Sequence, residues 1–281
     1  MRRTASISAS ITAAVAMAAG LSLAIPAAGA TASSSAPPVM TIAMNGKKIS
    51  VGGTLESGGV RIVSTVSGVA QAEPTLVRLD PGVSLAAFFA ALKKASGDPN
   101  NLDGIASIVV DAAANRGTSS IQASLLPGIY VALDTTASNP AKWPLTTFTL
   151  ARSAHPASLP APRATMAAIE FGFRGPGRLH DGELVRFVNR GFLVHMIVYL
   201  TARNAADARQ IATLLHQGKA GRASRLATGF GTFAGPLSHA GGQQFTVRSK
   251  PGYYVLACFM STQDGRDHTQ LGMERVIRIV K

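Results

Sequence analysis

The stretch GYYVLACFMSTQDGRDHTQLGMERVIRIV, residues 252–280, holds two strand-like segments and the only cysteine of the chain. Its ends, YYVLACF and RVIRIV, are rich in β-branched and aromatic residues, as strands packed on a core are. Pro251 and Gly252 stand before the first segment, where Pro presets φ and Gly accepts a positive φ in a turn. The stretch therefore predicts two β-strands joined by a loop, with Cys258 at the end of the first.

Short segments of the same kind come earlier in the chain. VRFVN (185–189), HMIVYL (195–200) and QFTVR (244–248) are separated by Gly, Pro and Asn, which mark turns. One helix-like segment, AADARQIATLLHQ (205–217), interrupts them. Many short strands with one helical insertion predict an all-β fold, and a Greek-key β-sandwich is its natural architecture.

The first half of the chain has the same order of segments. PTLVRL (74–79), a helix-like stretch (84–96), SLLPGIYVALDT (124–135) and TTFTLA (146–151) correspond to segments of the second half. Recurrence of a whole series of segments indicates a duplicated unit. We therefore predict two tandem sandwich domains, each with one short helical insertion.

A Pro-rich stretch divides the two copies and sets the predicted boundaries. The prolines and small residues of 152–163 read as a linker between a domain at 40–151 and a domain at 164–281. Charge changes at the same place. Residues 31–150 carry eight Lys/Arg and seven Asp/Glu, whereas residues 151–281 carry seventeen and seven.

The first thirty residues resemble an export signal. A basic start, an Ala-rich apolar stretch and small residues ending at Ala30 form the pattern of a secretory signal peptide, residues 1–30, followed by a short linker, 31–39. The apolar stretch is short for a membrane span. We expect a mature protein of about 250 residues that is extracellular or in the cell-envelope space, with no transmembrane segment once the signal is removed.

An unpaired thiol in an exported protein indicates an intermolecular disulfide, a reactive thiol or a metal ligand. The apolar faces of YYVLACF imply that Cys258 is buried, which argues against a disulfide and leaves an inert core residue or a shielded ligand. Cys258 is followed by His268 and Met273, and His195 begins a neighbouring predicted strand. Taken alone, a buried cysteine or histidine is more often an ordinary core residue. Together the four supply a thiolate, two imidazoles and a weak thioether, a set that selects copper and lets it cycle between Cu(I) and Cu(II).

These residues resemble the cupredoxins, the blue copper proteins of plastocyanin type. The resemblance covers roughly residues 164–281 and rests on PGYYVLACF, HTQLGM and the upstream FVNRGFLVHMIVYL. It implies that His195, Cys258, His268 and Met273 hold one type 1 copper and that the protein transfers single electrons or carries copper.

The first half lacks such a set. Alignment of the copies places Asp134 opposite Cys258 and Pro74 close to His195, and residues 31–150 contain neither His nor Cys. That half is expected to serve structure or partner binding. By resemblance, copper oxidases and nitrite reductases place a His directly beside the blue-copper cysteine. Cys258 is instead flanked by Ala257 and Phe259, so we expect a carrier or binding protein and not an enzyme.

The positive charge of the second half suits an acidic redox partner or an anionic cell envelope. Its Arg residues are dispersed along the sequence, and an exported protein seldom meets nucleic acid, so no nucleic-acid partner is expected. The competing hypothesis is a metal-free extracellular binding or structural module that retains Cys258 as a core residue.

Overall fold

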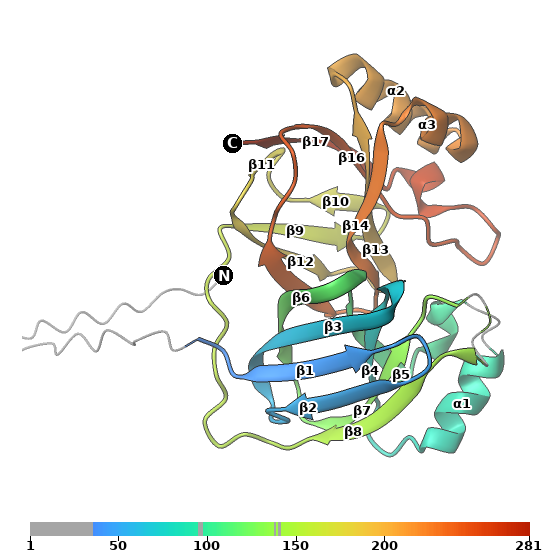
Figure 1. The fold of residues 1–281 in the computed structure, drawn as a ribbon. Helices are drawn as coiled ribbons and strands as arrows, with labels where there is room; N and C mark the ends of the chain where they lie inside the picture. The colour runs from blue at the N-terminus through green and yellow to red at the C-terminus, as the bar shows by residue number, and fades with distance from the viewer. Residues whose placement is uncertain (1–35, 95–97, 138, 140–141) are drawn as a thin grey trace, which may run out of the picture. The chain divides into compact units, whose positions relative to one another are not determined.

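The computed structural model describes residues 36–94, 98–137, 139 and 142–281, all of which belong to the same structural unit. The described part is mainly β, with sheets of eight, five and four strands and short helices (Figure 1). The predicted signal peptide, residues 1–30, and the start of the predicted linker lie outside the described residues. None of the helices in the described part has the length and apolar character needed to cross a membrane.

In the first half, two sheets enclose a core. One contributes β1 Val39–Met44, β2 Ile49–Gly53, β3 Gly58–Ala72 and β6 Ala114–Leu125; the other contains β4 Pro74–Leu79, β5 Ala106–Asp111, β7 Gly128–Asp134 and β8 Leu145–Leu150. Between them lie buried apolar side chains that include Ile62, Leu76 and Tyr130. Helix α1 Leu85–Lys94 and the 3-10 helix η1 Pro99–Leu102 cover the outer face of the four-stranded sheet, where Phe88 is fully buried.

The second half is built in the same way. Its strands are β9 Ala164–Ile169, β10 Gly172–Arg174, β12 Leu184–Asn189 and β15 Gly242–Thr246 in one sheet, and β11 Arg178–His180, β13 His195–Ala202, β14 Gly229–Leu237, β16 Gly252–Ala257 and β17 Glu274–Val280 in the other. Phe187, Leu256 and Cys258 lie in the core between these sheets. Helices α2 Ala205–His216 and α3 Ala220–Leu226 lie beside each other, and α2 packs on β13 and β16 (Figure 1).

Strand order is the same in the two halves. The series β2-β1-β3-β6 corresponds to β10-β9-β12-β15, and β5-β4-β7-β8 corresponds to β14-β13-β16-β17. Both Pro-Gly turns are also closed alike: the Tyr130 hydroxyl donates to the Leu126 carbonyl and the Tyr254 hydroxyl to the Lys250 carbonyl, each at 2.7 Å. These likenesses accord with a duplicated unit. The domain boundaries at 40–151 and 164–281 stay a prediction.

The sheets differ from a pair of separate antiparallel sandwiches in two ways. First, β1 runs parallel to β3, and β9 runs parallel to β12. In each half the chain forms an edge strand, β2 or β10, that lies in sequence between the two parallel strands of the pair. Second, β6 and β15 pair at Gln122 and Gln244, which joins strands of both halves into the eight-stranded sheet. The Gln244 side chain strengthens the junction by donating to the Gln122 side chain at 2.8 Å.

The predicted linker, 152–163, contains no strand, in agreement with its prolines, but it lies against the sheets. The Gly59 N–H donates to the Ala157 carbonyl at 2.6 Å, and the Gln244 side chain donates to the Pro160 carbonyl at 3.0 Å. These bonds attach the segment to strands of both halves.

Candidate metal centre

His195 is the first residue of β13, and the turn before it is held by a buried amide. The Asn189 Nδ2 donates to the Leu193 and Leu237 carbonyls at 2.7 Å each, and its Oδ1 accepts from the Gly191 N–H at 2.8 Å. A buried amide with its polar atoms satisfied fixes the chain around it. Here it fixes the path into β13, and His195 is 1% exposed.

Cys258 directly follows β16, the neighbour of β13, and is completely buried. Its N–H donates to the Met273 carbonyl at 3.2 Å. Its Sγ accepts from the Met196 N–H at 3.4 Å. The strand pairing therefore places the thiol of β16 beside the start of β13.

The nine residues 259–267 before His268 fold into a hairpin that closes on itself. The Ser261 hydroxyl donates to the Asp267 carboxylate at 3.0 Å, and the His268 N–H donates to the Met260 carbonyl at 2.8 Å. The chain thus leaves and returns at nearly the same place. The length of the loop does not move His268 away from the thiol.

The structure brings Cys258, His195 and His268 together. The Cys258 Sγ lies 3.8 Å from the His195 Nδ1 and 3.4 Å from the His268 Nδ1, and the two Nδ1 atoms are 3.0 Å apart. In the described part of the chain this is the one group of three or more His, Cys, Asp or Glu residues placed to hold a metal ion, with its ligand atoms within 4.8 Å of one another.

Met273, the fourth candidate, lies in the same buried core as Cys258 and is 0% exposed. Its N–H donates to the His268 carbonyl at 3.0 Å, and its carbonyl accepts from the Cys258 N–H. The 3-10 helix η3 His268–Leu271 and Gly272, with φ at 103°, turn the chain back to bring Met273 to this position. A positive φ of this kind favours glycine.

Without a metal the centre is electrically neutral. Burial raises the pKa of the Cys258 thiol to about 12. Burial, and then the neighbouring His268, lower the pKa of His195 to about 4, and burial also lowers the pKa of His268. Near neutral pH the thiol is therefore protonated, and both imidazoles are free of charge and able to act as ligands.

The donor set fits a metal ion of copper's character. Trigonal bonds of about 2.0 Å to nitrogen and about 2.3 Å to sulfur place ligand atoms roughly 3.5–3.8 Å apart. The two Sγ–Nδ1 separations of 3.8 and 3.4 Å are close to such a triangle, and the Nδ1–Nδ1 separation of 3.0 Å is shorter than it requires. A thiolate with two imidazoles is also the soft and borderline set that selects copper.

Glu170, which was not predicted from the sequence, is the acidic residue near the Nε2 atom of His195. Its Oε1 accepts from the Phe192 N–H at 2.5 Å and the Leu193 N–H at 3.0 Å, and lies 3.9 Å from the His195 Nε2. That nitrogen is buried and has no hydrogen-bond partner. Gly191 makes room, because a Cβ there would lie 2.7 Å from the same nitrogen. No local motif marks Glu170, since it reaches the site from the β9–β10 turn.

The counterpart in the first half has no metal-binding set. Pro74 and Asp134 are paired on the neighbouring strands β4 and β7. The Asp134 carboxylate accepts from the Thr136 hydroxyl at 2.6 Å and from the Glu73 N–H at 3.1 Å. At this position a carboxylate therefore ties the strand ends together.

No protein-family model matches the chain, and no curated protein matches it.

Solved structures similar to the chain include copper proteins of two sizes. The dithionite-reduced auracyanin of Roseiflexus castenholzii is 16% identical, with 42% of this chain and 95% of that chain covered and a TM-score of 0.27. A variant amicyanin in its reduced Cu(I) form is 13% identical, with 44% and 88% covered and a TM-score of 0.26. The copper-containing nitrite reductase of Thermus scotoductus is 12% identical, with 86% and 67% covered and a TM-score of 0.25. Because the TM-scores are this low, the similarity to these structures carries no argument about the function of this chain. Any functional argument rests on the residues of the candidate metal centre. The solved structures that the chain resembles are thus cupredoxins and multicopper proteins.

Proposed function

We propose that this chain is an exported cupredoxin-like protein that holds one type 1 copper ion in its second half and transfers single electrons or carries copper. His195, Cys258 and His268 would hold the ion as strong ligands, and Met273 would be a weak one. The observation that carries the proposal is the convergence of three buried ligand atoms within 4.8 Å from positions far apart in the sequence.

Copper would supply a one-electron couple at this centre. The protein's part is to hold the ligands and exclude water. The Met196 N–H stabilises a thiolate at Cys258 by donating to its Sγ, and the buried Asn189 keeps His195 in place. Ligands held rigidly in a trigonal arrangement suit both copper oxidation states, which is what an electron carrier requires.

Carriage or electron transfer is favoured over catalysis by the residues beside the thiol. Ala257 and Phe259 flank Cys258, and neither can ligate a second copper. The first half then serves as a structural or partner-binding domain in a tandem pair, a role supported by the repeated strand order.

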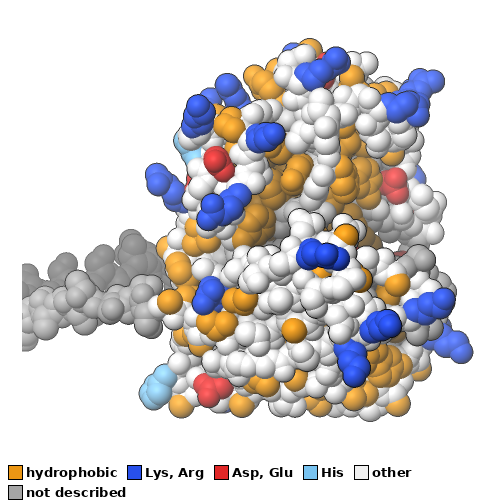
Figure 2. Space-filling view, viewed as in Figure 1, with side chains coloured by type: hydrophobic (Ala, Val, Ile, Leu, Met, Phe, Trp, Pro, Cys, Tyr) orange, Lys and Arg blue, Asp and Glu red, His pale blue; other side chains and the backbone are white. Residues whose placement is uncertain are grey.

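The proposed partner is an acidic redox protein or an anionic cell envelope. The chain has a formal net charge of +13. On the face shown in Figure 2, Lys and Arg side chains are spread singly over the surface and Asp and Glu are few. A diffuse positive field of this kind steers acidic partners without a built pocket for any one of them.

A metal-free binding or structural module is the second candidate, because Cys258 is packed among apolar side chains in the core and its thiol is protonated at neutral pH. The experiment that separates the two is loading of the purified chain with one equivalent of Cu(II). A thiolate–copper bond gives strong visible absorption from sulfur-to-copper charge transfer, and Cys258→Ser abolishes it, because an alcohol neither ionises nor donates as a thiolate does.

His268→Ala is expected to open the centre to exogenous ligands, whereas His180→Ala, at an exposed histidine, serves as the matched control. If wild type binds no copper, or if Cys258→Ser binds it with an unchanged spectrum, the metal-free module is the correct function.

A further inference from the structure

A cavity of about 510 Å³ is lined by residues next to the candidate metal ligands in sequence, Met196 and Phe259 among them, and by none of His195, Cys258 and His268. One wall comes from β4, β5, β7 and α1 of the first half. The opposite wall comes from the second half and includes Phe259, Met260 and Ser261 of the loop after Cys258. Its volume is in the range of small-molecule sites.

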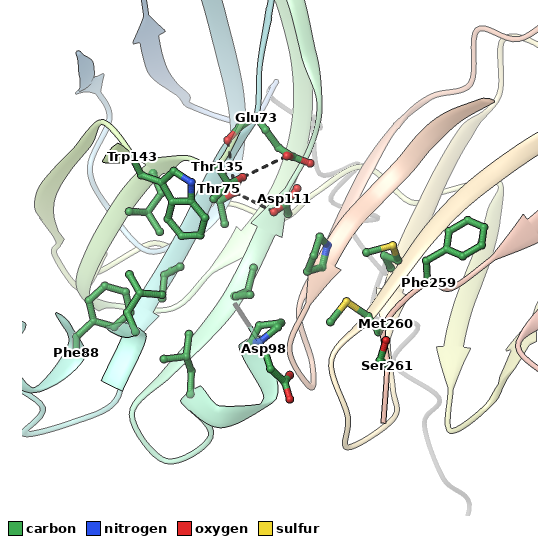
Figure 3. A pocket seen from close by; sticks show the side chains of 18 of the residues that line it. Glu73, Thr75, Phe88, Asp98, Asp111, Thr135, Trp143, Phe259, Met260 and Ser261 are labelled. Atoms are coloured by element: carbon green, nitrogen blue, oxygen red, sulfur yellow. Dashed lines mark hydrogen bonds between the residues drawn. The ribbon is translucent and has the colours of Figure 1, made fainter. Parts of the chain in front are cut away.

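Most of the lining is apolar, and part of it is aromatic. Phe88 and Trp143 stand on the first-half side, and Phe259 lies on the second-half side with its ring turned away from them, toward Phe230 (Figure 3). Aromatic faces attract cations as well as apolar groups. The body of an occupant would therefore be apolar and would gain from an adjacent positive charge.

The polar end of the cavity is a chain of two carboxyls and two hydroxyls. The Thr75 hydroxyl lies 2.8 Å from the Asp111 Oδ2 and 3.0 Å from the Thr135 hydroxyl, which lies 3.3 Å from the Glu73 Oε2 (Figure 3). The Thr75 hydroxyl donates to Asp111 and the Thr135 hydroxyl donates to Glu73, so each carboxyl is held in place by one hydroxyl.

The two carboxyls differ in how deeply they are buried. Asp111 is 2% exposed, its Oδ1 has no hydrogen-bond partner, and burial followed by the charge of Glu73 raises its pKa well above the usual range. Glu73 is half-buried at the cavity. Glu73 thus offers the carboxyl that an occupant can reach.

Charge over the whole cavity is also one-sided. Glu73, Asp98 and Asp111 line it, and the lining residues within the described ranges include no Lys, Arg or His. The chain as a whole has a formal net charge of +13. An acidic, aromatic cavity in so basic a protein selects against anions and favours cations.

We propose that this cavity binds a small organic cation with an aromatic or alkyl body and one primary ammonium group. The ammonium group donates to the Glu73 carboxylate, and the body packs against Trp143 and the apolar side chains that line the cavity. No candidate copper ligand lines the cavity, so the proposed binding uses residues other than those of the metal centre.

The test uses calorimetric titration of the full mature chain, metal-free and copper-loaded, with three probes of similar size: 2-phenylethylammonium, 2-phenylethanol and 3-phenylpropionate. We expect the ammonium probe to bind at least tenfold more tightly than the alcohol and the carboxylate probe to show no binding. The metal-free chain should give the same order, which separates this site from the copper proposal.

Two variants test the two parts of the site. Glu73→Gln should weaken binding of the ammonium probe at least tenfold and leave binding of the alcohol probe unchanged. Asp103→Asn, at an exposed acid outside the cavity, should leave the binding of both probes unchanged. Leu92→Trp, which fills the cavity from α1, should weaken the binding of both probes. Circular dichroism and unfolding midpoints verify that each variant is folded. Equal binding of ammonium and alcohol, or unchanged binding in Glu73→Gln, would overturn the proposal.

Discussion

The Nε2 of His195 lies 3.9 Å from the Oε1 of Glu170, and no other polar partner reaches that buried nitrogen among the described residues. When Nδ1 ligates a metal, Nε2 carries the proton, and an outer carboxylate makes the imidazole a stronger donor. Glu170 also closes the turn over His195 by accepting two backbone N–H groups. One carboxylate therefore positions the ligand and places a negative charge near it.

Glu170→Gln should raise the copper reduction potential. The carboxylate favours Cu(II) over Cu(I), so its loss favours the reduced form, by an amount on the order of the 59 mV that a tenfold change in equilibrium gives for one electron. Voltammetry of the copper-loaded protein measures it. Glu56→Gln, at a glutamate in the first half whose carboxylate accepts from the Ser153 hydroxyl, is the control and should leave the potential unchanged. A lower potential in Glu170→Gln would contradict this role.

Met273→Leu should shift the reduction potential of the copper centre without abolishing copper binding. A thioether is a weak axial ligand, so the strong visible absorption should persist while the reduction potential rises. Met166→Leu, at another fully buried methionine of the same core, is the matched control for the loss of sulfur from the core. Equal shifts in the two variants would show that Met273 acts by packing alone.

Copper affinity should rise with pH. The thiol of Cys258, with its pKa raised to about 12, is protonated at neutral pH, while His195, with its pKa lowered to about 4, is already neutral. Binding of a thiolate ligand therefore releases one proton, and the affinity increases about tenfold for each pH unit between about pH 6 and pH 8. Competition with a chelator of known affinity at several pH values measures the slope. Cys258→Ser should lose this dependence, and a flat wild-type profile would exclude thiolate binding.

Ionisation of Asp111 at high pH should lower the free energy of unfolding. Burial and Glu73 raise the pKa of this carboxyl in the folded state, so the folded protein holds a proton that the unfolded chain has released. Its stabilisation is present below the unfolded pKa and is lost as pH rises toward the folded pKa, at about 1.4 kcal/mol per pH unit. Urea unfolding across this range measures the slope. In Asp111→Asn, which has no such proton, this slope should disappear; if it persists, another group is responsible.

Much of the fold and the grouping of the candidate ligands could be predicted from the sequence because both depend on local patterns. The predicted strand at 195–200 and helix at 205–217 match β13 and α2 closely, since their apolar periodicity is unambiguous. His195, Cys258 and His268 converge as the strand order of a sandwich requires. The grouping of their ligand atoms needs only that β13 and β16 be neighbours and that the loop after Cys258 return to its start.

The features that sequence missed depend on contacts between distant segments. The two halves are joined at Gln122 and Gln244, and glutamine is an ordinary residue in a surface strand. Glu170 reaches His195 only after two turns have formed, and Asn189 looks like a common turn residue until its burial is known. Such positions carry no periodicity for a single sequence to reveal.

The complete burial of His268 has a kinetic consequence. Its Nε2 is enclosed, the Phe171 ring makes an edge contact with its ring, and the hairpin 259–267 just before it is closed by the Ser261–Asp267 hydrogen bond. A metal ion cannot diffuse into such a centre from solvent, so uptake and release wait for the hairpin to open locally. The exchange half-life should then follow the frequency of that opening and not the concentration of the ion, so a tightly closed hairpin would make the bound metal inert even to strong chelators.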